Sequence, residues 1–347
     1  MVPVLVGILV VTFALARLIP GDPCYVMLGE RATPGQCQEF RERFGLNDSL
    51  PIQFTRYVDH VLHGDFGASI RDKRPVTDIL AERLPMTLEL AIAAMIFATL
   101  VGVSLGILSA IRHNSAVDVG TMIIANMGVS MPVFWVGLML AYVFALLLRG
   151  TPFFIPPSGR LSAGLAMTPL AQQWGLEALN GAPKFIVSFL SNSVILHSLL
   201  TFNFPVLKDA LWHLILPALA VGTIPLAIIA RMTRSSLLDT LGQDYIRTAR
   251  AKGLASGTVL MRHAMRNALI PIITIVGLQT GILLSGAVLT ETVFALPGMG
   301  TQIVSAILAR DYPVVQGFTV AVAVIFALVN ILVDLSYAYV DPSIQIK

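Results

Sequence analysis

The chain has 347 residues, of which 56% are hydrophobic and 12% charged, with a formal net charge of +3 and a mean hydropathy of +0.79. Soluble domains carry roughly 25% charged residues, so this composition disfavours a soluble enzyme, a disordered chain and a nucleic-acid-binding domain. Two cysteines are too few for a disulfide scaffold or a cysteine-rich zinc site. The composition therefore predicts an all-α polytopic protein whose surroundings are a lipid bilayer.

Long uncharged runs predict the membrane-spanning helices. A spanning helix needs roughly 20 apolar residues. Six segments satisfy this length or come close to it: 1–19, 89–111, 119–148, 211–231, 267–290 and 315–338. The first segment could instead be a signal peptide, but it begins without basic side chains and has only a weak cleavage-site pattern, which favours a retained helix.

A further uncharged run, 185–207, contains eight polar residues. Four of them recur at the helical spacing 188, 191, 198 and 201, as in an amphipathic helix that lies on a membrane surface or in a loop. We therefore favour an outer amphipathic helix over a seventh span. A true span here would reverse the orientation of everything before it.

Charge predicts the orientation of the spans. The segment 231–266 carries seven Lys/Arg and two Asp, and the positive-inside rule places such a short basic segment in the cytoplasm. Both termini are then cytoplasmic, whereas 20–88 and 149–210 lie outside. An outer, oxidising compartment leaves two states open for Cys24 and Cys37, a disulfide or two unpaired thiols.

The chain is thus expected to consist of three parts. These are a first transmembrane helix (1–19), a small extracytoplasmic cap segment (20–84) and a transmembrane core (85–341) that includes the outer loop 149–210 and the cytoplasmic loop 231–266. The cap has too few apolar residues to hold a large core.

The cytoplasmic loop predicts an ordered helix–turn–helix. Asp244 is a plausible N-cap for a helix over 245–252, Gly253 is well placed to end that helix, and Ser256 can cap the next one. Each basic side chain here could by itself be only a topology signal. The ordered pattern as a whole indicates a docking element.

No catalytic motif is found. The sequence contains no phosphate-binding loop, nucleophile elbow or metal-ligand spacing, so no catalytic residue and no metal ligand is predicted. Glu89 and Asp334 lie near span ends, where an interfacial or helix-packing role is expected. Gln279, at mid-span, could line a pathway or form a hydrogen bond to a neighbouring helix.

Several sequence motifs carry a family resemblance over nearly the whole chain. The most specific stretch is 244–253 followed by 262–268, which is similar to the cytoplasmic EAA loop of ABC importer permeases in its peptide-permease form. The general EAA pattern would have Glu, Ala and Pro at Arg247, Thr248 and Arg266, so the match is to the peptide-type subgroup. Further matching motifs are 18–23, 50–53, 64–67, 84–90, 291–294, 296–298, 311–313 and 340–342. The chain therefore resembles permease subunits of binding-protein-dependent ABC importers of the dipeptide, oligopeptide and nickel type.

The resemblance implies a half-pore in a prokaryotic inner or plasma membrane. A second homologous permease would complete the pathway, two cytoplasmic ATPase subunits would bind ATP and Mg, and an extracytoplasmic binding protein would deliver the substrate to the segments 20–88 and 291–313. This chain would itself hold no cofactor. Peptides are the favoured substrate; nickel, glutathione and other small solutes are alternatives, and an ATP-independent carrier or channel and a membrane enzyme are rival classes. The implied ATPase-coupling residues are Tyr245, Arg247, Ala249, Arg250, Lys252 and Gly253, with Ala249 allowing close approach of the partner.

Overall fold

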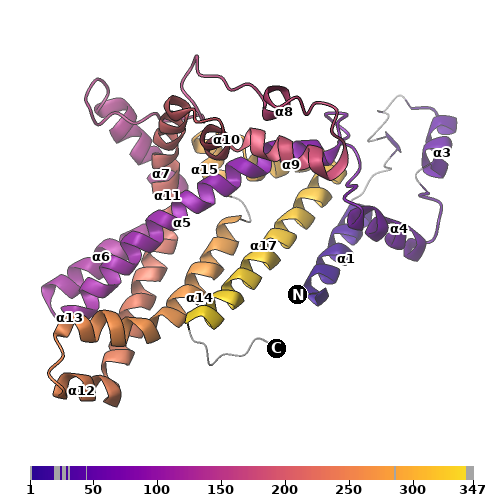
Figure 1. Cartoon of the computed structure of the whole chain (residues 1–347). Coiled ribbons are helices and arrows are strands. Elements are labelled where there is room, and N and C mark those ends of the chain that lie inside the picture. The colour runs from indigo at the N-terminus through magenta and orange to yellow at the C-terminus, as the bar shows by residue number, and fades with distance from the viewer. Residues whose placement is uncertain are drawn as a thin grey trace. The chain divides into compact units, whose positions relative to one another are not determined.

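The computed structural model describes residues 2–18, 24–25, 29, 32–43, 45–284 and 287–340. This part of the chain is almost entirely helical and contains no strand, only an isolated bridge between Ala68 and Pro75. Figure 1 shows the helices coloured in chain order. The predicted all-α class is confirmed.

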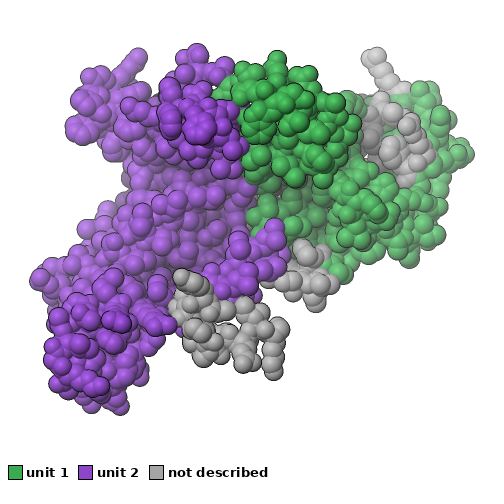
Figure 2. Space-filling model, in the orientation of Figure 1, with its two compact units in different colours: residues 1–85, 167–193, 297–325 green, residues 86–166, 194–296, 326–347 purple. Residues whose placement is uncertain are grey.

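The residues gather into two compact units, which Figure 2 shows in green and purple. Unit 1 comprises residues 1–85, 167–193 and 297–325, and unit 2 comprises 86–166, 194–296 and 326–347. Each unit thus combines stretches that lie apart in the sequence. The division into a cap segment (20–84) and a transmembrane core (85–341) stays a prediction.

Unit 1 contains several short helices and the beginnings of two long ones. Its helices are α1 (Val2–Leu18), α3 (Pro34–Arg43), α4 (Leu50–Leu62), α8 (Leu170–Gln173), α9 (Gly181–Asn192), α16 (Met299–Leu308) and the first residues of α5 (Val76–Ile111) and α17 (Tyr312–Val340).

Unit 2 holds most of the long apolar helices. It contains the remainder of α5 and α17 together with α6 (Ala116–Ser130), α7 (Val133–Ala141), a π-helical segment (Tyr142–Leu147), α10 (Val194–Leu200), α11 (Phe204–Leu241), α12 (Asp244–Ala251), α13 (Ser256–Thr258), a second π-helical segment (Val259–Ala264), α14 (Met265–Leu284) and α15 (Val288–Val293).

Four helical stretches within the described residues are long and apolar enough to cross a membrane, and the number rises to six if each of two bent helix pairs is one span. The four are α5, α11, the stretch Ser256–Leu284 and α17 as far as Tyr337. They contain the predicted spans 89–111 and 211–231 and all but the last residue of 315–338. The predicted first span corresponds to α1, whose 17 helical residues extend about 26 Å.

The predicted span 119–148 is wrong as a single straight helix. It is divided into α6 and α7, which meet at a bend of 102°. Met131, the residue before Pro132, has an extended backbone (φ −103°, ψ 138°). The proline ring disfavours a helical conformation at the preceding residue, so Pro132 explains the position of the break.

Two further predicted segments are also divided. The predicted span 267–290 extends too far at its C-terminal end. Helix α14 ends at Leu284, and α15 is a separate helix that starts at Val288. The run 185–207 is not one amphipathic helix. It falls within α9, α10 and the start of α11, and Ser193 between the first two has an extended backbone (φ −82°, ψ 94°).

Helix α11 is the central element of unit 2, and it contacts α6, α7, α10 and α14. Small residues allow close approach of its neighbours, as in many membrane proteins. A Cβ atom on Gly106 of α5 would lie 2.6 Å from the Ala230 carbonyl oxygen, and one on Gly128 of α6 would lie 2.8 Å from that of Thr223. Any larger residue at these two positions would force the helices apart.

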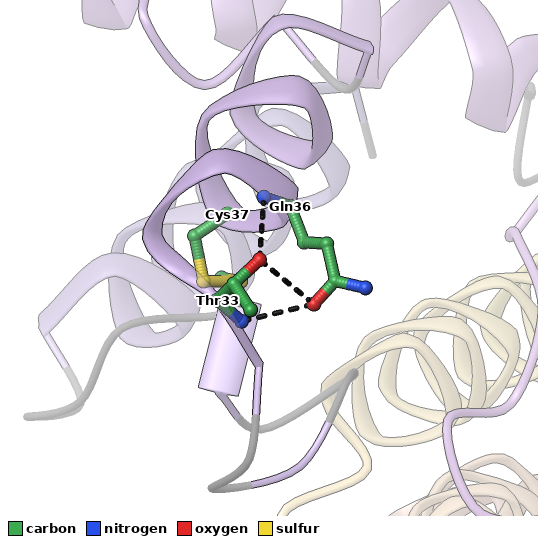
Figure 3. The surroundings of a disulfide bond; sticks show 4 residues. Thr33, Gln36 and Cys37 are labelled. Atoms are coloured by element: carbon green, nitrogen blue, oxygen red, sulfur yellow. Dashed lines mark hydrogen bonds between the residues drawn. A yellow bond between two sulfur atoms is a disulfide. The ribbon is translucent and has the colours of Figure 1, made fainter.

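In unit 1, Cys24 and Cys37 are joined by a disulfide (Figure 3), with their Cα atoms 5.3 Å apart. Both cysteines are buried and pack with Phe40. Figure 3 also shows Thr33 and Gln36 beside the bond, where the Thr33 hydroxyl donates to the Gln36 side-chain oxygen at 3.1 Å. The structure thus contains the first of the two states that the sequence left open.

Removing this bond is expected to destabilise the segment around α3. The bonded residues are 13 apart in the sequence, and closing a loop of about that length stabilises a fold by roughly 3 kcal/mol. Cys37→Ser should therefore make this segment more sensitive to proteolysis. Alkylation of the wild-type chain should add mass only after reduction; two thiols that react without reductant would contradict the bond.

Candidate functional site

The short helix α12 has one buried and one exposed face. Ile246 and Ala249, three residues apart, share a side of the helix and are 0% and 7% exposed. They belong to a hydrophobic cluster in unit 2 that includes Leu237 of α11 and Ala268 of α14. The other six residues of α12 are exposed. The helix is therefore attached to the ends of two long helices by one side only.

The start of α12 differs by one residue from the prediction. The N-cap is Gln243, whose side chain makes no capping hydrogen bond, and Asp244 is the first helical residue. Asp244 still suits this position, because a carboxylate in the first turn interacts favourably with the helix dipole. The second predicted cap is wrong in the same way, since Ala255 precedes α13 and Ser256 is already helical.

The end of α12 agrees with the prediction. Gly253 follows the C-cap residue Lys252 and has a φ of +77°, the left-handed conformation that glycine adopts at low cost. Its N–H donates to the Arg250 carbonyl at 2.9 Å, and the N–H of Leu254 donates to that of Ala249 at 3.4 Å. These two bonds form a Schellman motif, which ends the helix and turns the chain.

We define the docking face as the exposed residues Tyr245, Arg247, Arg250, Lys252 and Gly253. Three of the five carry positive charge. The Tyr245 hydroxyl accepts a hydrogen bond from the Asn267 side-chain amide at 2.6 Å, which holds the ring beside the start of α14. All five residues are among the six expected to couple to an ATPase.

Ala249, the sixth expected coupling residue, does not lie on the docking face. It packs inside its own chain in the cluster described above. Our expectation that it allows close approach of a partner is therefore corrected: Ala249 allows close approach of α12 to neighbouring helices of the same chain.

An ion pair missed by the sequence analysis lies nearby in unit 2. Asp118 of α6 accepts hydrogen bonds from Nε and Nη2 of Arg234 of α11, both at 2.8 Å. It also accepts from the Asn114 backbone N–H at 3.0 Å and from the Ser109 hydroxyl. We had assigned Arg234 to the cytoplasmic loop 231–266, but helix α11 continues to Leu241. The pair ties α6 and the end of α5 to α11.

The remaining membrane-edge and mid-span candidates are Glu89, Gln279 and Asp334. The first two are buried within the chain, and the third is exposed. Glu89 is 9% exposed and accepts hydrogen bonds from Arg160 at 3.0 Å and from the Ile195 N–H at 2.8 Å, so it anchors parts of the outer loop. Gln279 is 6% exposed, which favours packing within its own chain over lining a pathway. Asp334 is exposed.

A buried carboxylate in unit 1 fixes part of the predicted outer surface. Asp311, just before α17, is 2% exposed. Its oxygens accept hydrogen bonds from the backbone N–H groups of Ile70 and Arg71 at 3.0 and 3.2 Å and from the Ser69 hydroxyl. The two predicted outer segments, 20–88 and 291–313, are thereby joined at this point.

No group of three or more His, Cys, Asp or Glu side chains is placed to hold a metal ion within the described ranges. The residues instead define a polytopic helical membrane protein with an exposed helix–turn–helix between two of its long helices. The sequence matches the family described as binding-protein-dependent transport system inner membrane component over residues 102–346, and the N-terminal part of such membrane components over residues 1–91. The chain belongs to this family of transport permease subunits.

Curated relatives are similar to the chain over its whole length. The dipeptide transport system permease protein DppB of Alkalihalophilus pseudofirmus is 44% identical over 99% of this chain and 96% of its own length. The protein of the same name in Escherichia coli K12 is 42% identical over 100% and 96%. The di/tripeptide transport system permease protein DppB of Pseudomonas aeruginosa is 43% identical over 99% and 96%.

Proposed function

We propose that this chain forms half of the translocation pathway of an ATP-driven importer for short peptides. A second homologous permease completes the pathway, and an extracytoplasmic binding protein delivers the substrate. Full-length identity of 42–44% to permeases named for dipeptides and di/tripeptides is the observation that carries the substrate class. Two separate ATPase subunits bind ATP and Mg and hydrolyse the ATP.

The docking face is the proposed contact with one ATPase. Its exposed cations Arg247, Arg250 and Lys252 can pair with carboxylates on a partner, and its turn at Gly253 presents them on a compact projection. The buried face of α12 packs in a cluster with residues of α5, α11 and α14. A displacement of α12 by the ATPase would therefore move three long helices together.

The proposed orientation puts α12 and both chain termini in the cytoplasm. The basic segment 231–266 supports this side through the positive-inside rule. The segment joined at Asp311 is then extracytoplasmic and available to the binding protein. The disulfide of Cys24 and Cys37 would lie in the same oxidising compartment.

Purification in mild detergent followed by mass spectrometry tests the partners. We expect two ATPase subunits and a second permease to copurify. Reconstituted with the binding protein and ATP, the complex should import a labelled dipeptide. Transport by a lone chain without ATP would contradict the proposal and indicate a carrier or channel. ATP-dependent import of nickel or glutathione but not of peptides would contradict the substrate class.

A further inference from the structure

A groove of about 490 Å³ lies in unit 2 between α6 and α11. Small-molecule sites commonly measure about 300–1,000 Å³, so a short peptide segment would fit. The lining reaches Ser130, the last residue of α6 before the bend at Pro132. Its lining residues are Met122, Asn126, Val129, Ser130, Arg231 and Arg234.

The lining carries an uncompensated positive charge. Arg234 is neutralised by Asp118, which it contacts through two nitrogens. Arg231 is exposed and donates one hydrogen bond, from Nη2 to the Asn126 side-chain oxygen at 3.1 Å. Among the residues that the structure describes, no carboxylate lies within ion-pair distance of Arg231. One guanidinium is thus left to attract an anion.

Arg231 lies well inside the helical part of the chain. It precedes the end of α11 at Leu241 by about ten residues, or about 15 Å. Its partner Asn126 lies a similar distance from the start of α6 at Ala116. A topology signal requires only a basic residue on the cytoplasmic side, so an arginine in the loop after α11 would serve that purpose as well. Arg231 instead follows directly on the uncharged run 210–230 of α11, at the cytoplasmic end of the proposed span, which is the side on which an imported substrate would leave.

We infer that Arg231 binds the terminal carboxylate of a peptide as it passes through the groove. A guanidinium has five N–H donors, and the bond to Asn126 uses one, so a pair remains for the two oxygens of a carboxylate. Such bidentate contacts favour arginine over lysine in strength, while the open groove keeps the contact wet and reversible. This inference rests on the proposed function and adds a substrate-contacting residue to it.

The test uses the assembled importer with its binding protein, a labelled dipeptide and Arg231→Cys. The chain's own two cysteines are joined to each other, so this variant adds the single free thiol of the permease. We expect dipeptide uptake to fall at least tenfold. A cationic aminoethyl methanethiosulfonate should restore much of it, because the new disulfide carries an ammonium group. The anionic sulfonatoethyl reagent should not. Added dipeptide should slow both modifications.

Arg112→Cys is the matched control, since Arg112 is an exposed arginine beside the end of α5 and outside the groove. It should import normally with or without either reagent. Arg231→Lys should keep more uptake than Arg231→Gln but less than wild type, because lysine retains the charge without the bidentate contact. Arg231→Gln should behave as the unmodified cysteine variant. Each variant is compared at equal recovery of the ATPases and the second permease, so loss of assembly is not mistaken for loss of transport.

The outcomes separate the two proposals. Normal uptake by Arg231→Cys or Arg231→Gln, equal effects of the two reagents, or no protection by the dipeptide would overturn the role of Arg231 while leaving peptide import intact. Reagent-specific rescue without protection would point to a carboxylate of the second permease as the partner. Failure of the wild-type complex to import dipeptide would overturn the proposed function, and the inference with it.

Discussion

Replacing Gly253 with glutamate is expected to abolish ATP-driven uptake while the chain remains inserted and its core folded. Gly253 has a φ of +77°, which costs other residues roughly 1–2 kcal/mol. No heavy atom lies within 4 Å of the position of its missing Cβ. The new side chain would therefore project from the turn and place a carboxylate on the basic docking face. Uptake, measured against membrane content of the chain, should fall by more than tenfold.

Gly253→Asn is the control for the backbone, because asparagine tolerates the left-handed conformation better than most residues. It should retain more uptake and more bound ATPase than the glutamate variant. Wild-type uptake by a well-expressed Gly253→Glu variant would defeat the assignment of the docking face.

Two alanines of α12 provide a second comparison for the same prediction. Ala251 is exposed and Ala249 is buried, although they are two residues apart. Ala251→Trp should reduce ATPase binding without changing thermal stability. Ala249→Trp should overpack the cluster at a cost of about 1–3 kcal/mol and lower the melting temperature of the chain. The opposite assignment of these two effects would mean that α12 is rotated relative to this structure.

The largest loss of stability is expected from Asp118→Ala. Asp118 is 4% exposed and accepts hydrogen bonds from Arg234, Ser109 and the Asn114 backbone. Its removal would leave the Arg234 guanidinium partly buried without its anion, which is more damaging than the absence of the whole pair. The melting temperature in detergent should fall by about 5 °C or more, and uptake should fall with it.

The exposed pair Asp244–Arg247, with its atoms 3.4 Å apart, is the matched control. Asp244→Ala should leave the melting temperature nearly unchanged, since exposed ion pairs contribute little. The double variant Asp118→Leu with Arg234→Met should recover part of the stability that Asp118→Ala loses. Equal melting temperatures for Asp118→Ala and Asp244→Ala would show that the buried pair does not hold these helices together.

Features encoded by neighbouring residues were predictable. Gly253 after a short polar helix indicated the turn, because few other residues adopt a positive φ at low cost. The uncharged run 312–333 indicated most of α17, because about 20 successive apolar residues are enough for a membrane-spanning helix. Pro132 also carried a local signal, since it disfavours helix at Met131, but the length of the apolar run hid it. The first residues of α12 and α13 were each predicted one position too late. Asp244 and Ser256 are residue types that favour the N-cap, but the N-caps are their preceding neighbours Gln243 and Ala255.

Features that join distant residues were not predictable. The contacts of Asp311 with 69–71 and of Asp118 with Arg234 connect segments more than a hundred residues apart, and no periodicity reports such a pairing. The direction of Ala249 was missed for a related reason. An alanine fits either face of a short helix, and only the position of the neighbouring helices decides which face is covered.

The sequence by itself determined that this chain resides in a membrane, since its 12% of charged residues cannot cover a soluble fold of this size. It also determined where the charged residues gather, including the basic segment that contains the docking face. Only the tertiary structure decided which basic residues are loop residues and which lie inside a helix. Helix α11 continues to Leu241, past the predicted end of its span at 231, because its neighbours hold it there. Arg234 thereby pairs with Asp118 instead of lying in a loop, and the Arg231 side chain lines a groove between two helices.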